Sequence, residues 1–164
     1  MDDARRVAQF EKRARHLPHW EGPGETYFVT FCLRRPPTVD LTDPEIAPLV
    51  VGALRHFDGR RYVLYDYTVM PDHVHLIMRP VVCNGRAERL HQITHSLKSW
   101  LAHAINKRLG RSGRVWQEEA CDHVIRNDRD YEEKSTYIRN NPGERGLLGV
   151  LAEWPWWGTG SGCR

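Results

Sequence analysis

The chain has 164 residues, among them 24 Lys and Arg, 21 Asp and Glu and 9 His, and its formal net charge is +3. This length predicts one domain over residues 1–164, large enough to bury a core without covalent staples. Hydrophobic residues make up 40% of the chain and charged residues 27%, which excludes wholesale disorder. No stretch approaches the roughly 18 apolar residues of a membrane helix, and the acidic start lacks the apolar core of a secretory signal. We therefore expect a soluble cytoplasmic protein without membrane partners.

The four cysteines, at positions 32, 83, 121 and 163, are far apart and form no Cys-x-x-Cys pair. Their spacing excludes a zinc knuckle or ribbon and argues against a disulfide framework. Cys32 lies in an apolar run, so its simplest role is to fill the core.

The first third of the chain predicts an arm, a strand and a helix. Residues 1–24 are polar and basic and end in a Pro- and Gly-containing turn, so they are predicted to form an N-terminal arm. Residues 27–33 are rich in β-forming side chains and predict a buried strand. Apolar residues then recur at helical spacing over 44–56, with Thr42 or Asp43 as the expected N-cap.

The middle of the chain predicts a hairpin followed by a long helix. Residues 62–70 and 73–79 are expected to pair as antiparallel strands around a tight turn at 71–72. Residues 87–109 have the apolar spacing of an amphipathic helix, and Gly110 is the expected C-cap.

The C-terminal third predicts one more strand and one more helix. Residues 121–126 are a short strand candidate. The last helix is expected to be capped by Asn127 or Asp128, to reach about Asn141 and to stop at Pro142.

The last residues include the run Trp-Pro-Trp-Trp at 154–157, which is expected to lie against the body as an aromatic clasp. Residues 158–164 are predicted to form a flexible tail. Strands interleaved with helices indicate an α+β fold, in which two or three helices pack on one antiparallel sheet of about five strands.

The small net charge hides a strong division along the chain. Residues 86–114 hold seven basic residues and one acid, whereas residues 117–133 hold seven acids and two arginines. A basic element beside an acidic one can hold a polyanion near a metal site. A solvated helix face followed by an acidic loop explains the same pattern.

The first candidate for chemistry is the pair His73 and His75. In a strand, residues i and i+2 point to one face, so both imidazoles can converge on one ion while Val74 faces the core. A His-x-His pair is a weak motif by itself. A metal site and two surface histidines at the rim of a sheet both remain open.

The second candidate is Tyr137 on the last predicted helix. Asn141 lies four residues later on the same face, with Glu133 one turn earlier. Tyr131 and Ile138 lie on a different face and are the expected core anchors. A boundary tyrosine with a buried ring and a wet hydroxyl is the alternative.

The third group of candidates could contact DNA. Lysines and arginines can bind phosphates, and Trp100 or Trp116 could stack on a base, although a core tryptophan is an equal alternative. His123 could be a ligand, a base or a hydrogen-bonded strand residue. The candidate DNA contacts are Arg86, Arg89, Lys98, Lys107, Arg108, Arg114 and His123.

Together these residues suggest one reaction. A divalent metal held by His73, His75 and Asn141 would polarise a phosphodiester. The phenol of Tyr137 would attack it and form a phosphotyrosine, which conserves the bond energy for rejoining to another strand.

The sequence resembles a known family over nearly its whole length. Residues 62–79, with the run Val-Met-Pro-Asp-His-Val-His-Leu at 69–76, resemble the signature of the IS200-like tyrosine transposases, a branch of the HUH nucleases. Within that branch the chain is most similar to the REP-associated tyrosine transposases. Further similar segments occur in the same order at 17–20, 27–31, 116–117, 122–126, 137–142, 146–147 and 154–156.

The resemblance implies a ferredoxin-like HUH fold and a DNA transposition activity. His73, His75 and Asn141 would bind Mg²⁺ or Mn²⁺, and Tyr137 would form a 5′-phosphotyrosine. The substrate would be single-stranded DNA hairpins, the REP palindromes, with a flanking guide sequence, which implies association with the nucleoid. The chain departs from the family at Asp72, where relatives commonly have Asn, and at residues 143–144, where a small apolar residue commonly follows Asn-Pro.

Two other hypotheses stay open, as does the oligomeric state. The chain could be a catalytically inactive protein that binds DNA hairpins. It could also be a metal-dependent hydrolase that uses water, with Tyr137 only structural. A monomer and a homodimer are both compatible with the sequence.

Overall fold

The computed structural model describes residues 24–151 and 153–163. The predicted N-terminal arm therefore lies outside the described residues, except for Gly24. None of the helices in the described part of the chain is long and apolar enough to span a membrane.

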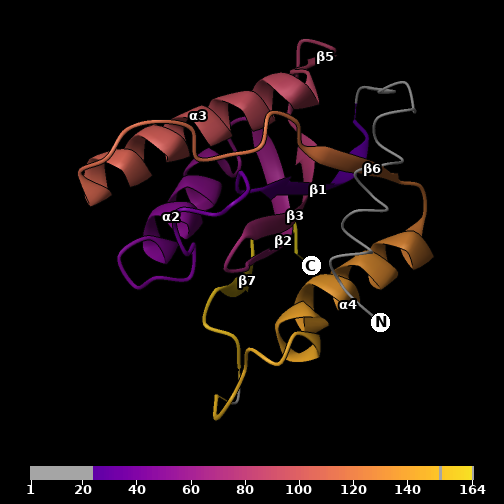
Figure 1. The fold of residues 1–164 in the computed structure, drawn as a ribbon. Helices are drawn as coiled ribbons and strands as arrows, with labels where there is room; N and C mark the ends of the chain where they lie inside the picture. Colours follow the sequence, from indigo (N-terminus) through magenta and orange to yellow (C-terminus); the bar gives the residue numbers. More distant parts are fainter. Residues whose placement is uncertain (1–23, 152, 164) are drawn as a thin grey trace.

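One five-stranded antiparallel sheet forms the centre of the fold, with three described helices around it (Figure 1). The α+β prediction is confirmed. The strands, in spatial order, are β6 (Cys121–Ile125), β1 (Thr26–Cys32), β3 (His73–Pro80), β2 (Tyr62–Val69) and β7 (Trp157–Thr159). The helices are α2 (Ala47–Phe57), α3 (Leu90–Leu109) and α4 (Asp128–Glu144). Two short strands, β4 (Val82–Cys83) and β5 (Arg86–Ala87), pair in a separate ribbon.

The two faces of the sheet bury different clusters. The larger cluster joins one face to α2 and α3 and contains Val29, Leu54 and Leu97. The smaller cluster joins the other face to α4 through Phe28 and Ile138. The helices α2 and α3 thus cover one face, and α4 covers the other (Figure 1).

Strand β3 lies in the middle of the sheet, between β1 and β2. Val74, Leu76 and Met78 belong to the larger cluster, so the next residues along the strand, His73 and His75, face α4. The predicted hairpin of β2 and β3 around residues 71–72 is confirmed, with Val69 opposite Val74.

Three predicted helix boundaries were wrong. Helix α2 begins at Ala47, with Ile46 as N-cap, because residues 43–46 form turns in which the Asp43 carboxylate accepts the Glu45 amide. Helix α3 begins at Leu90, because residues 86–87 pair in β5. Helix α4 continues past Pro142 to Glu144, where the Arg145 amide still donates to the Asn141 carbonyl.

The C-terminal segment completes the sheet. Trp154 donates its indole Nε1–H to the Val69 carbonyl at 3.0 Å, so the predicted clasp exists. The flexible tail predicted from residue 158 is wrong over 158–163, because β7 pairs with β2. Beyond β7, the Gly160 amide donates to the Tyr65 carbonyl at 2.7 Å. An edge strand leaves backbone groups unpaired, and these backbone contacts cover that edge of β2.

The close approach of the tail predicts a cost for a side chain at Gly160. A Cβ there would lie 2.5 Å from Leu64 Cβ and 2.6 Å from its carbonyl oxygen. We expect Gly160→Ala to lower the free energy of unfolding by about 1–3 kcal/mol in urea denaturation. The control is Gly52→Ala, at an exposed helical position with no atom within 4 Å of the added Cβ. It should raise stability by about 0.5–1 kcal/mol. A neutral Gly160→Ala would mean that the tail does not pack in solution.

Candidate active site

The two candidate histidines are buried at the start of β3, and each is only 2% exposed. Their Nε2 atoms are 2.9 Å apart. The interpretation as surface histidines is therefore wrong. The strand alternation brings both rings to the α4 face, as the i, i+2 spacing predicts.

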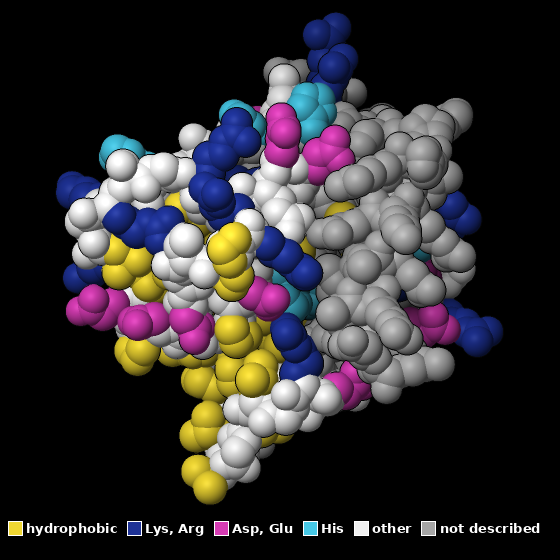
Figure 2. Space-filling view, in the orientation of Figure 1, with side chains coloured by type: hydrophobic (Ala, Val, Ile, Leu, Met, Phe, Trp, Pro, Cys, Tyr) yellow, Lys and Arg dark blue, Asp and Glu magenta, His cyan; other side chains and the backbone are white. Residues whose placement is uncertain are grey.

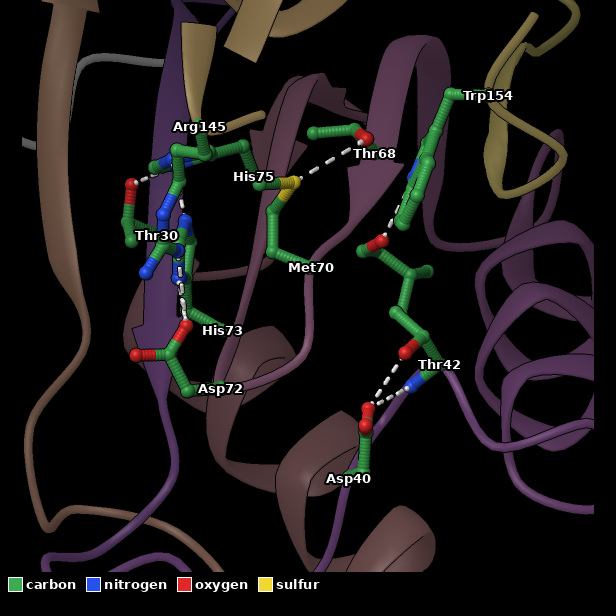
Figure 3. Close-up of polar contacts among 11 residues, drawn as sticks. Thr30, Asp40, Thr42, Thr68, Met70, Asp72, His73, His75, Arg145 and Trp154 are labelled. Atoms are coloured by element: carbon green, nitrogen blue, oxygen red, sulfur yellow. Dashed lines mark hydrogen bonds and ion pairs between the residues drawn. The ribbon is translucent and has the colours of Figure 1, made fainter. Parts of the chain in front are cut away.

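The Nδ1 atom of each ring, which points away from the other ring, has its own partner (Figure 3). His73 Nδ1 lies 2.7 Å from Asp72 Oδ1, and His75 Nδ1 lies 2.7 Å from the hydroxyl of Thr30. Thr30 is the residue of β1 directly opposite His75. The carboxylate can only accept, so His73 carries its proton on Nδ1 and presents the Nε2 lone pair inward. The Thr30 hydroxyl can donate or accept, so His75 can present Nε2 either with or without a proton.

Burial and charge keep the site in a defined protonation state. Burial, with a smaller effect of the Arg145 charge, holds the pKa of His75 well below its ordinary value. A hydrogen bond from His73 holds the pKa of the Asp72 carboxyl well below its usual range. At neutral pH the site therefore contains a neutral His75 imidazole and an ionised Asp72.

Tyr137 reaches the same place from α4. Its ring centre lies 5.3 Å from that of His75 and 6.0 Å from that of Phe28. The Lys134 ammonium, one turn earlier on the helix, lies 5.6 Å from the centre of the Phe28 ring. The half-buried ring of Tyr137 thus lies beside the His75 imidazole and the Phe28 ring, and the Lys134 ammonium lies near that same Phe28 ring.

Asn141 is 1% exposed, and neither its Oδ1 nor its Nδ2 has a hydrogen-bond partner among the described residues. It lies on α4 between Tyr137, which contacts His75, and Arg145, which donates to Asp72 at 3.1 Å. Positions four residues apart share a helix face, so Asn141 faces the histidine pair. A buried amide without partners costs about 1–3 kcal/mol, which makes a ligand or a bound water its expected partner.

These residues fit a divalent metal ion. Adjacent nitrogen ligands at about 2.1 Å from an octahedral ion are about 3 Å apart, close to the observed spacing of the imidazole nitrogens. The described residues contain no cluster of three His, Cys, Asp or Glu side chains suited to a metal. The amide oxygen of Asn141 is a type of donor that such a cluster does not include, and it is a candidate third ligand.

Among the alternatives for His123, the structure agrees with a hydrogen-bonded strand residue. It lies on the same face, opposite Phe28 on the neighbouring strand, but its Nε2 lies 2.9 Å from Asp130 Oδ2. Asp130 also accepts the Arg126 amide, and its own amide donates to the N-cap Asn127. His123 thus fastens the start of α4 to the sheet and lies one strand away from the histidine pair.

No family model matches this chain. A REP-associated tyrosine transposase of Escherichia coli is 27% identical over 133 residues, which cover 80% of this chain and 74% of that protein. A Haemophilus influenzae protein, provisionally given the same name, is 28% identical over 141 residues, or 81% of this chain and 78% of that protein. The resemblance to the REP-associated tyrosine transposases is confirmed.

The fold agrees with that of a solved transposase. A structure described as a REP-associated tyrosine transposase bound to a REP hairpin superimposes with a TM-score of 0.70. The two chains are 24% identical, and the match covers 87% of this chain and 81% of the other. At this identity the likeness shows a shared transposase fold.

Most of the side chains predicted from the sequence to contact DNA lie apart from the histidine pair. Five of them are exposed near β5, along α3 or just after it, namely Arg86, Arg89, Lys107, Arg108 and Arg114. Lys and Arg side chains are visible over this part of the surface in Figure 2. The structure therefore separates the exposed cations around α3 from the site under α4.

Lys98 does not belong to this surface. It is 8% exposed, and its ammonium donates to the carbonyls of Gln117 and Glu118 at 2.7 and 2.9 Å. Burial lowers its pKa. The prediction that Lys98 contacts DNA is wrong, because both hydrogen bonds of its ammonium hold the 117–118 loop against α3. Trp116 packs edge-on against Phe31 in the core, whereas Trp100 is 49% exposed on α3.

The sequence pattern did not predict some of the residues that surround the histidine pair. Thr30 and Phe28 reach the histidines only because β1 pairs with β3 in one register. Arg145 lies far from Asp72 along the chain. A register between distant strands and the docking of a helix are tertiary facts, which local spacing does not encode.

Lys98→Met is expected to lower the free energy of unfolding by about 1–3 kcal/mol, because two partly buried carbonyls lose their donor. Lys107→Met removes the same charge from the exposed last turn of α3 and should change stability by no more than about 0.5 kcal/mol. Urea denaturation of both variants measures the difference. Equal stability would contradict a structural role for Lys98.

Proposed function

We propose that the chain is a metal-dependent single-stranded DNA endonuclease and strand transferase that acts on DNA hairpins through Tyr137. One observation carries the proposal: two buried imidazoles converge at 2.9 Å beside the ring of Tyr137. The names of the curated relatives and the hairpin described in the similar structure support this substrate class. Action on chromosomal palindromes would also place the protein at the nucleoid.

The residues of this chain would share the reaction as follows. The phenol oxygen of Tyr137 attacks the phosphorus, and its proton passes to water. A bond from Tyr137 Oη to phosphorus forms while the bond from phosphorus to the 3′ oxygen breaks, and that oxygen takes up a proton. The product is a 5′-phosphotyrosine with a free 3′ hydroxyl. A second 3′ hydroxyl reverses the step and releases Tyr137.

His73, His75 and Asn141 would hold the metal ion. Bound Mg²⁺ or Mn²⁺ would polarise the phosphodiester and offset the charge that develops on it. Asp72 and Thr30 orient the two rings so that each Nε2 faces inward. Lys134, one turn before Tyr137, places its positive charge over the Phe28 ring that packs against Tyr137.

All of these groups come from one chain, so one copy would contain a complete site. The exposed cations around α3 would bind the phosphates of the hairpin and so position it electrostatically. The flanking guide sequence would be recognised by contacts to bases, which the positions of these cations do not specify.

Tyr137→Phe is expected to abolish a covalent DNA–protein adduct while hairpin binding persists, because the ring stays and only the nucleophilic oxygen is lost. The measurement is a denaturing gel of protein with a labelled single-stranded hairpin oligonucleotide and Mn²⁺. Tyr131→Phe is the matched control, since it removes a phenol hydroxyl from the same helix. That hydroxyl donates a hydrogen bond to Asp66. It should still form the adduct.

Each alternative hypothesis gives a different gel. Cleavage by Tyr137→Phe at the wild-type rate, with free 5′ phosphates, would identify a hydrolase that uses water. Binding on a native gel without cleavage at any Mn²⁺ concentration would identify an inactive hairpin-binding protein.

Thr30→Val is expected to weaken Mn²⁺ binding by about 10- to 100-fold, because the partner of His75 Nδ1 is lost while the shape is kept. Thr68→Val is the matched control, because Thr68 is the buried residue opposite His75 on β2. Among the described residues its hydroxyl has only a long contact to Met70 Sδ. Isothermal titration with Mn²⁺ measures both variants. Equal losses would remove the argument that Thr30 orients a ligand.

A further inference from the structure

Helix α4 carries Tyr137 but buries little apolar surface. The buried apolar side chains of α4 are Ile138 and Pro142. Polar contacts to the sheet supplement this packing at the start, the first turns and the end of the helix. They are Asp130 to His123 at 2.9 Å, Tyr131 to Asp66 at 2.9 Å and Arg145 to Asp72 at 3.1 Å.

The contact at the C-terminal end differs from the other two because its acceptor, Asp72, also contacts the proposed ligand His73. A single atom, Asp72 Oδ1, lies 2.7 Å from His73 Nδ1 and 3.1 Å from Arg145 Nη1 (Figure 3). The same carboxylate oxygen therefore orients the imidazole and receives the end of α4.

Because the helix is rigid, this contact also affects the position of Tyr137. Tyr137, Asn141 and Arg145 follow one another at four-residue spacing, which is about 6 Å per step along one helix face. A shift of the last turn against the sheet would therefore move Asn141 and Tyr137 relative to His73 and His75.

We propose that Arg145 is a positioning residue, which sets the distance between Tyr137 and the histidine pair by binding Asp72. This rests on the proposed function, because the reaction requires the phenol beside the histidines. The Asp72 carboxylate has two tasks, as acceptor for His73 and as anchor for α4. The pair is partly exposed, with 31% of the Arg145 side chain and 39% of the Asp72 side chain accessible, so its contribution to global stability is small.

The main test is Arg145→Met, which keeps the aliphatic stem and removes the donor. We expect the rate of adduct formation at saturating hairpin and Mn²⁺ to fall about 10- to 100-fold, the loss that follows from a misplacement of about 1 Å. The hairpin concentration for half-maximal rate should change less than about 2-fold, because Arg145 positions the helix and does not bind DNA. The control is Arg139→Met, which removes the same charge from an exposed site on α4 near Trp157. It should keep the wild-type rate.

A double-variant cycle separates the contact from other effects of Arg145. Asp72→Ala alone is expected to slow the reaction, since it also releases His73. Adding Arg145→Met to Asp72→Ala should then cause less than about 2-fold further loss, because the partner is already gone. Hydrogen exchange gives a readout without DNA or metal: Arg145→Met should speed exchange of backbone amides over 141–147 and leave those over 130–135 unchanged.

Three kinetic results would overturn the inference. They are a wild-type rate for Arg145→Met, a change confined to the half-saturating hairpin concentration, and losses that multiply in the double variant. Unchanged hydrogen exchange over 141–147 would also contradict it. If the wild-type protein forms no adduct, the proposed function fails, whereas the exchange experiment still decides whether Arg145 fastens the helix.

Discussion

The two-residue alternation of strand β3 is the constraint on which the structure depends. Val74, Leu76 and Met78 lie in the larger core, which holds α2 and α3 against the sheet. The same geometry turns His73 and His75 to the opposite face, under α4. Because β3 is the central strand, neither imidazole can reach bulk solvent from the side, and both are buried. The packing that stabilises the fold thus also fixes the positions of the two histidines.

Burial then sets the chemistry of the site. A buried imidazole loses its hydration, so the neutral form of His75 is favoured. Asp72 and Thr30 occupy the outer nitrogens, which leaves the inner nitrogens facing each other. The unpaired amide of Asn141 costs stability in the isolated chain.

The two faces of the sheet have different roles. Helix α3 is fixed by a continuous apolar stripe and by the buried ammonium of Lys98, and exposed cations lie along and around it. Helix α4 buries few apolar residues and is fastened by ion pairs and hydrogen bonds. Polar contacts depend on exact geometry more than apolar ones do, so they fix the position of α4, and of Tyr137 on it, more narrowly than apolar packing alone would.

The sequence alone determined the alternation of β3, the β2–β3 hairpin, the shared face of Tyr137 and Asn141, and the family resemblance. Each follows from local periodicity or from residues in fixed order. The tertiary structure decided the rest. It paired Thr30 with His75, placed Arg145 on Asp72, buried Lys98 and His73, and bound the tail to β2. These contacts join residues far apart in the chain, and only strand register and helix docking define which distant groups meet.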